Sequence, residues 1–262
     1  MATSNARPGL PNPKSIVAEI PFGAGGAEAP GGAAPVYRIL RTNEVDGYEK
    51  KPSKAAVAEA MFVEAKKKRK PGEQFGGTSR RIAKLSVADV KFEKFADVAA
   101  LIATLPAHAV MVKKKIPTDA KSNRVAEEKR NVRMEAFIYA ASVEDDNDYH
   151  LILGRAPDAG GSPVYMTMEL SGLPPSNMKS HAALKAAREA FKKFFAKVFN
   201  GDLPGTSYDF YDPPIRVEVE GSLFWDASHA KGSRPGPQSL RPNMPVVWEV
   251  HPISKMKLFP PA

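Results

Sequence analysis

Five strand-like runs and one long amphipathic helix dominate the C-terminal half of this chain of 262 residues. Three runs precede the helix and two follow it, and residues typical of turns separate them. A helix between the third and fourth of five strands is the order of an OB-fold, a partly open Greek-key barrel. We therefore predict an α+β fold, in which a five-stranded OB-like barrel with a helix between strands three and four is preceded by a smaller helical segment. The runs cover residues 132–142, 149–153, 164–170, 215–225 and 246–253, and the helix covers residues 177–200.

This helix has the clearest pattern in the chain. Ser176 or Asn177 can cap its first turn, and Gly201 follows its last turn, as helix ends favour. Burying a large apolar side chain stabilises a fold by about 2 to 3 kcal/mol, so we expect its apolar stripe to lie in the core. The stripe consists of Leu184, Ala187, Phe191, Phe194, Phe195 and Val198.

The rest of the chain divides by composition. Residues 1–35 are rich in Gly, Ala and Pro and indicate a disordered leader, or alternatively an extended arm anchored by a few apolar side chains. Residues 36–123 form a basic, mainly helical segment, with helices predicted over residues 53–70 and 95–105. A polar, proline-containing stretch places a domain boundary near residue 123, so the OB-like barrel domain covers residues 124–262.

The positive charge is concentrated in the middle segment. The formal net charge is +9, and residues 36–130 carry 22 basic and 12 acidic side chains. Residues 131–262 carry 14 basic and 15 acidic side chains, so the predicted barrel lacks the positive field of a nucleic-acid-binding groove. The alternative for the lysine run is a solvated helix end that complements the helix dipole. The predicted contacts to an anion or nucleic acid are Lys66, Lys67, Lys68, Arg69, Lys70, Arg80 and Arg81.

Carboxylate and imidazole side chains recur on or beside the predicted strands. Together they can hold a divalent cation, and a histidine can also act as a general base. Structural alternatives stay open, because acidic residues are common in hairpin turns and a buried imidazole can be satisfied by backbone partners. The candidate metal ligands are Asp146, Asp148, Asp226, His229 and His251, with Asp145, His150 and Glu249 nearby in the sequence.

Several function classes are excluded by missing residues. The chain has no cysteine, which removes disulfides, thiolate metal sites and cysteine nucleophiles. It also has no G-x-S-x-G nucleophile elbow, no P-loop and no H-E-x-x-H helix. The N-terminus is unlike a secretory signal, and no apolar run approaches the ~20 residues of a membrane-spanning helix. We therefore expect a soluble, cytoplasmic protein with no membrane partner.

Three motifs of the C-terminal half occur together in a family that the chain resembles. They are DDNDYHL at residues 145–151, GSLFWD at residues 221–226 followed by His229, and WEVHPI at residues 248–253. The combination resembles a family of uncharacterised bacterial proteins with an OB-like domain. The resemblance covers residues 124–257 and implies no particular activity.

The absence of a complete catalytic motif favours a non-enzymatic function. We predict a binding or scaffold protein whose OB-like domain binds a protein or small ligand and whose basic middle segment contacts an anionic partner such as nucleic acid. The alternative is a metal-dependent hydrolase or phosphodiesterase that uses the Asp and His side chains of the barrel. A divalent cation is the one cofactor that the sequence suggests.

Overall fold

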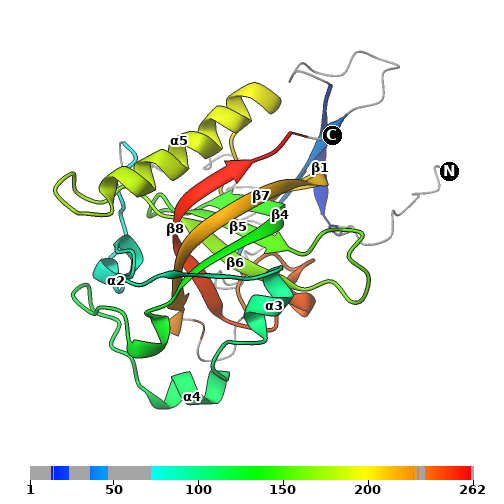
Figure 1. The fold of residues 1–262 in the computed structure, drawn as a ribbon. Helices are drawn as coiled ribbons and strands as arrows, with labels where there is room; N and C mark the ends of the chain where they lie inside the picture. Colours follow the sequence, from blue (N-terminus) through cyan, green and yellow to red (C-terminus); the bar gives the residue numbers. More distant parts are fainter. Residues whose placement is uncertain are drawn as a thin grey trace, which may run out of the picture.

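One mixed sheet of eight strands organises the molecule, and the long helix α5 and several short helices lie around it (Figure 1). The computed structural model of the chain describes residues 13, 15–23, 36–46, 72–227, 229 and 234–260. The strands are β1 (Ile16–Phe22), β2 (Tyr37–Thr42), β3 (Phe92–Lys94), β4 (Asn131–Val143), β5 (Tyr149–Gly154), β6 (Tyr165–Leu170), β7 (Asp209–Trp225) and β8 (Trp248–Leu258). The helices are α2 (Arg81–Leu85), α3 (Val98–Ile102), α4 (His108–Lys113) and α5 (His181–Val198), with 3-10 turns η1 (Ala126–Glu128) and η3 (Arg241–Asn243).

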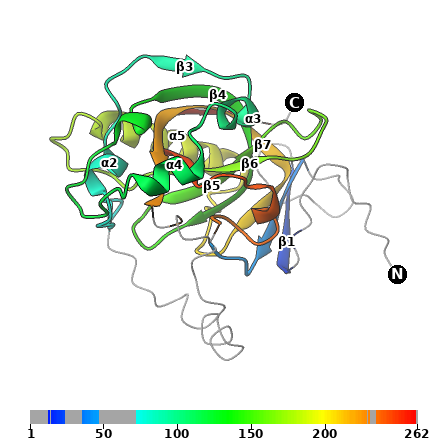
Figure 2. The same cartoon turned by 90° about the horizontal axis from the view of Figure 1, so that it is seen from below.

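The strands follow the order β1-β2-β7-β8-β6-β5-β4-β3. Most neighbours are antiparallel, whereas β3 runs parallel to β4, and β6 pairs with β8 in parallel at Met168 and Val250. β4 pairs with β5 on one side and with β7 on the other, although β7 is distant from it in that order. The sheet therefore curls strongly around one interior, which Figure 2 shows from below.

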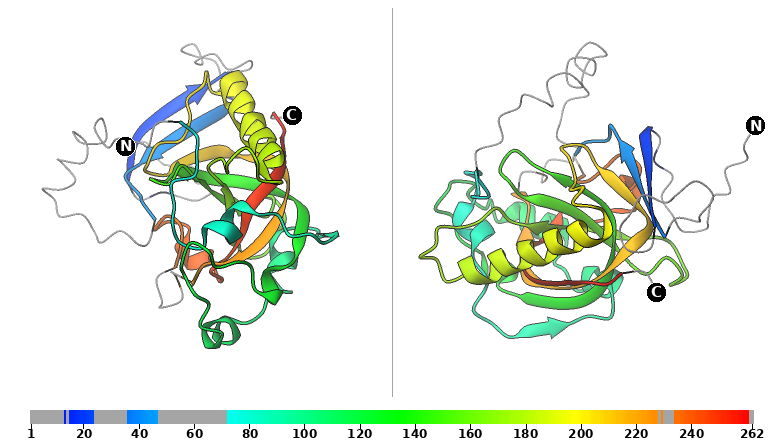
Figure 3. Two further views of the ribbon diagram at one scale, coloured as in Figure 1. Left: turned by 90° about the vertical axis from the view of Figure 1, so that its left-hand side faces the viewer. Right: turned by 90° about the horizontal axis from the view of Figure 1, so that it is seen from above.

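Helix α5 covers part of this curled sheet and packs against β8 (Figure 3). The ring of Phe195 lies 4.4 Å from that of Phe191 and 5.8 Å from that of Tyr211 in β7, measured between centroids. The prediction that the apolar stripe of this helix is buried is therefore confirmed. The main core also contains Phe22 and Tyr37, so residues on both sides of the predicted boundary near residue 123 share one interior.

The predicted five-stranded OB-like barrel is wrong as a description of this architecture. The C-terminal half has three strands, helix α5 and two strands in that sequence order, but β1, β2 and β3 join them in one eight-stranded mixed sheet. The preceding segment is also not mainly helical where it is described, because α2, α3 and α4 have only five or six residues each. Strand pairing with β7 and β4 determines the structure of this segment, and local helix propensity does not.

Other local predictions have mixed outcomes. The helix predicted over residues 95–105 is shorter, since α3 begins after Asp97, whose side chain accepts a hydrogen bond from the Ala100 amide. Residues 16–22 form the edge strand β1, although the sequence indicates a disordered leader there. The helix predicted over residues 53–70 lies outside the described residues.

Within the described part of the chain, no helix has the length and apolar character needed to cross a membrane.

Candidate metal centre

Three strands bring two histidines to the two oxygens of one glutamate. His150 in β5 is the register partner of Glu169 in β6, and the pairing of β6 with β8 brings His251 next to the same glutamate. Nε2 of His150 lies 2.9 Å from Oε1 of Glu169, and Nδ1 of His251 lies 2.7 Å from Oε2. The side chain of His150 is 9% exposed, and those of Glu169 and His251 are at most 2% exposed. Glu169 thus connects the two histidines inside the protein.

Strand alternation explains why these polar side chains lie on one face. Side chains in a strand point alternately to opposite faces of the sheet. In β5, Leu151 and Leu153 belong to the main apolar core, whereas Ile152 belongs to a second, smaller cluster. His150 shares its face with Ile152, and so points away from the main core.

Four carboxylates flank the two histidines. Near His150, Nδ1 lies 3.2 Å from Oε1 of Glu144 and 3.7 Å from Oδ2 of Asp46. Near His251, Nε2 lies 3.4 Å from Oδ2 of Asp148, and Nδ1 lies 3.6 Å from Oε2 of Glu249. We call this set the buried centre; it comprises Asp46, Glu144, Asp148, His150, Glu169, Glu249 and His251.

Two separations in the buried centre fit a shared cation better than a direct hydrogen bond, whereas the two contacts of Glu169 have hydrogen-bond length. Charged hydrogen bonds between nitrogen and carboxylate span about 2.7–2.9 Å. Two ligands that each lie about 2.0–2.1 Å from one tetrahedral ion are about 3.3 Å apart. The 3.2 Å separation at His150 and the 3.4 Å separation at His251 match the second value.

Buried polar atoms without hydrogen bonds concentrate in this centre. Among the described residues, fifteen buried side-chain nitrogen and oxygen atoms have no hydrogen-bond partner, and seven of them belong to the centre. Such atoms are rare in native proteins, and each costs about 1–3 kcal/mol when it stays unsatisfied. The seven are Asp46 Oδ1, Asp148 Oδ2, His150 Nδ1, Glu169 Oε2, Glu249 Oε2, His251 Nδ1 and His251 Nε2. Among them, Glu169 Oε2 and His251 Nδ1 lie 2.7 Å apart and form an ion pair when the histidine is protonated, so the cost applies to the other five.

Other atoms of the same carboxylates are held firmly. The amide of Gly172 donates to Oδ1 of Asp148 at 2.6 Å, which leaves Oδ2 facing His251. The amide of Gly236 and the hydroxyl of Tyr208 donate to Oδ2 of Asp46 at 2.9 and 3.1 Å. Each carboxylate is therefore positioned through one oxygen while its other oxygen has no hydrogen bond.

The two carboxylates beside His150 have opposite pKa shifts. Burial alone would raise the pKa of Asp46, but the neighbouring His150 and the Gly236 amide lower it to about 2. Burial raises the pKa of Glu144 to about 7 against the attraction of His150, and the charges of Glu169 and Asp46 act in the same direction as burial. Only one of the two carboxylates is thus fully charged near neutral pH.

The more deeply buried carboxylates also have shifted pKa values. Burial, together with neighbouring carboxylates, raises the pKa of both Asp148 and Glu249 well above the ordinary range. Burial opposes the charge of Glu169 as well, but the two histidines hold its pKa well below the ordinary value. Half-buried Lys84 in α2 keeps a pKa well above the ordinary value despite burial, because Glu169 and Asp148 stabilise its charge. The raised pKa values mean that protons stay on some of these carboxylates, which reduces the repulsion between them. A bound cation would reduce the same repulsion.

The predicted ligands divide among three places. Asp148 and His251 lie together in the buried centre. His229 lies with Nε2 3.4 Å from Oδ2 of Asp226 and 3.8 Å from Oδ1 of Asp46, which places this pair beside the centre. Asp146 lies in the turn before β5, where its Oδ1 accepts a hydrogen bond from the Asp148 amide at 3.3 Å.

Three residues of the buried centre, Asp46, Glu144 and Glu169, are not among the candidate ligands that the sequence suggests. Glu169 alternates with apolar residues in β6, and this period-2 pattern was the one available signal that it shares a face with Thr167. Glu144 was part of an acidic loop with no distinguishing spacing. Asp46 lies more than one hundred residues before His150, so only tertiary structure brings them together.

The predicted anion contacts are not supported by the described arginines. Arg80 is 1% exposed and donates from both terminal nitrogens to Glu128 at 2.7 Å, so it is unable to reach a surface ligand. Arg81 is half-buried, with its guanidinium 5.8 Å from the ring centroid of Phe75. The basic run at residues 66–70 lies outside the described residues, and its contact with an anion stays a prediction.

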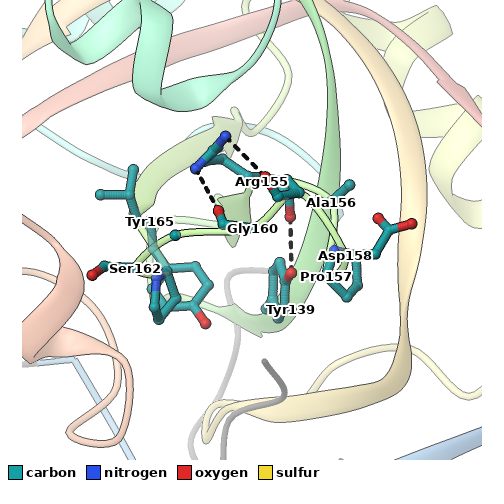
Figure 4. A pocket seen from close by; sticks show the side chains of 12 residues that line it. Tyr139, Arg155, Ala156, Pro157, Asp158, Gly160, Ser162 and Tyr165 are labelled. Atoms are coloured by element: carbon teal, nitrogen blue, oxygen red, sulfur yellow. Dashed lines mark hydrogen bonds between the residues drawn. The ribbon is translucent and has the colours of Figure 1, made fainter. Parts of the chain in front are cut away.

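Two surface hollows lie elsewhere. One has a volume of about 270 Å³ between Tyr139 and the loop that follows β5 (Figure 4). Its arginine, Arg155, is already engaged, because it donates to the Gly160 carbonyl at 3.0 Å and to Asp97 at 2.9 Å. The other, of about 570 Å³, lies between α5 and residues near β3 and includes Phe92 and Met178. Neither is lined by a residue of the buried centre.

Comparison of the chain with protein-family models, with curated proteins and with solved structures finds no match. The resemblance to an uncharacterised bacterial family therefore stays a prediction. The geometry of the buried centre is the basis for a functional proposal.

Proposed function

We propose that this protein binds a divalent metal ion in the buried centre, between His251 and Asp148 and beside Glu169. One observation carries the proposal. Nε2 of His251 and Oδ2 of Asp148 are buried atoms that can bind a metal, they lie 3.4 Å apart, and neither has a hydrogen bond. A cation between them satisfies both atoms. It also offsets the negative charge that burial makes expensive.

The donor set narrows the choice of metal. Imidazole nitrogen suits transition metals, whereas carboxylate oxygen also suits Mg²⁺, Ca²⁺ and Mn²⁺. A mixed site of imidazole nitrogen and carboxylate oxygen therefore favours Mn²⁺ or Zn²⁺ over Ca²⁺, which takes six to eight oxygen ligands. The same centre has no thiolate, since the chain lacks cysteine.

Metal binding to the full chain tests this proposal. After treatment with EDTA and its removal, the protein is titrated with Mn²⁺, and the bound ion is measured by loss of the free-ion EPR signal. We expect Asp148→Asn and His251→Gln each to weaken binding at least tenfold. The control Glu189→Gln, on the exposed face of α5, should leave binding unchanged. No binding of Mn²⁺ or Zn²⁺ by the wild-type chain would refute the proposal.

A second candidate function is metal-dependent hydrolysis of a phosphodiester, and Lys84 is the observation that favours it. A charged lysine is no metal ligand. Nζ of Lys84 lies 5.8 Å from the ring centroid of Phe224, which is 5.4 Å from that of His251, and despite burial the charges of Glu169 and Asp148 raise the pKa of Lys84. In a hydrolase, such a cation stabilises negative charge on the phosphoryl oxygens, and a bound metal supplies an activated water.

The hydrolase candidate predicts a separable effect of Lys84. With Mn²⁺ present, the wild-type chain should release nitrophenolate from bis(p-nitrophenyl) phosphate. Lys84→Met should reduce this rate by at least tenfold while Mn²⁺ binding persists, and Lys193→Met, an exposed control on α5, should not. If the wild-type protein binds Mn²⁺ but does not hydrolyse the ester, the proposal of metal binding stands and the hydrolase candidate is refuted.

A further inference from the structure

We infer that the buried centre holds a second divalent ion, at Asp46, Glu144 and His150. The inference rests on the proposed function, because both ions share one centre. It adds a site with its own ligands on the opposite side of the His150 ring.

The two nitrogens of His150 face different groups. Nε2 lies 2.9 Å from Oε1 of Glu169, so this side of the ring carries the proton that the carboxylate accepts. Nδ1 has no hydrogen-bond partner, and it faces Glu144 at 3.2 Å and Asp46 at 3.7 Å. A divalent cation bound at Nδ1 would replace the proton that otherwise balances these two carboxylates, since a metal-bound imidazole nitrogen must be deprotonated.

One ion is insufficient to serve both halves of the centre. The imidazole ring of His150 stands between its Nδ1 and the oxygens of Glu169, while the donors near His251 lie beyond that glutamate. An ion at Nδ1 therefore lies outside the reach of His251. The same separation distinguishes this arrangement from a two-metal clamp, whose ions lie about 3.5–4 Å apart around one substrate oxygen.

The second site is built and positioned. The side chains of Asp46 and His150 are 8% and 9% exposed. Oδ1 of Asp46 has no hydrogen bond, whereas its Oδ2 is held by the Gly236 amide and the Tyr208 hydroxyl. Glu144 is 37% exposed, so this half of the centre is open to solvent through one ligand.

Glu169 is a positioning residue for both sites. A metal-bound histidine commonly gives its second ring N–H to a carboxylate, which sets the tautomer and the ring orientation. Here one carboxylate lies beside a ring nitrogen of each histidine. Loss of the Glu169 charge should therefore weaken the binding of both ions, whereas loss of a ligand should abolish the binding of one ion.

Counting bound Mn²⁺ tests the second site. The full wild-type chain should bind two equivalents, as measured by EPR of free Mn²⁺ and by metal analysis after dialysis. The double variant Asp46→Asn/Glu144→Gln should bind one equivalent, and so should Asp148→Asn/Glu249→Gln. Glu169→Gln should weaken both ions by about tenfold or more, the size typical of lost outer-shell partners. Glu189→Gln serves as the matched control.

Each result has a distinct meaning. One equivalent in the wild-type chain overturns the second site and leaves the proposed function intact. Two equivalents retained by Asp46→Asn/Glu144→Gln overturn the assignment of ligands. No bound Mn²⁺ in the wild-type chain removes the proposed function and this inference together. If the double variant does not fold, as judged by circular dichroism, Glu144→Gln alone tests the site, because its side chain is the most exposed ligand.

Discussion

Arg80 illustrates how burial changes the role of a single residue. The sequence suggests a surface contact to an anion, but the side chain is 1% exposed and faces Glu128, which is fully buried. Glu128 also accepts hydrogen bonds from the amides of Trp225 and Val125 at 2.9 and 2.8 Å. This carboxylate connects the end of β7 to the segment before β4, and Arg80 balances its charge.

We expect Arg80→Met to destabilise the fold by about 3–5 kcal/mol, because it leaves the Glu128 carboxylate buried without its partner. Urea unfolding followed by circular dichroism gives the free energy of unfolding. The control is Arg216→Met, which breaks the exposed pair with Glu135 and should leave the unfolding midpoint nearly unchanged. Equal midpoints for the two variants would contradict the buried pair.

At the scale of elements, β7 holds the sheet together. Its 17 residues pair with β2, β4 and β8. The β7–β8 register shifts at Gly221, where a Cβ would lie 2.5 Å from the carbonyl oxygen of Pro252. Because the backbone of β8 is this close, the strand requires glycine at this position.

Gly221→Ala should therefore destabilise the protein by about 1–3 kcal/mol, the usual effect of overpacking a well-packed interior. Gly205→Ala is the matched control, since a Cβ at that glycine meets no atom within 4 Å. Urea unfolding compares the two variants. A loss at Gly205 as large as that at Gly221 would show that the close approach of β8 is not the cause.

At the scale of the whole molecule, metal binding should couple to folding. The ligands come from β5, β6 and β8, the turn before β5 and the segment after β2, so an ion that binds them stabilises the assembled sheet. Free ion at one hundred times its Kd contributes about 2.7 kcal/mol per site. For a chain of this size, each kcal/mol raises Tm by about 2–4 °C.

We expect saturating Mn²⁺ to raise Tm, and the increase to shrink as the pH falls from about 7.5 to about 5.5. Protons compete for the carboxylates, and the pKa of Glu144 is already about 7. Without metal, in EDTA, the expected trend is the reverse. The pKa of Glu144 is higher in the folded than in the unfolded state, so the stability that Glu144 contributes falls as the pH rises from about 4.5 to about 7. Scanning calorimetry with Mn²⁺ or EDTA checks both trends, and a Tm increase by Mn²⁺ that does not depend on pH would contradict the first.

The accuracy of the sequence-based predictions depended on the range of the interactions concerned. The aromatic stripe of α5 was predictable, because helical periodicity is a local property of residues such as Phe191 and Phe195. Asp148 and His251 were candidates because they combine metal-binding chemistry with positions in or beside strands, and the structure brings them together in the buried centre. Asp46 and Glu169 lie beside them but were not candidates, since residues so distant in sequence have no local pattern that connects them.

The sequence by itself determined the five C-terminal strands, the helix among them and the burial of that helix, since these depend on alternation and helical spacing. Only the tertiary structure decided that β1, β2 and β3 complete an eight-stranded sheet. It alone also placed Glu169 between two histidines, because strand order and register are properties of pairing between distant segments. Those pairings position the buried centre on which the proposed metal binding rests.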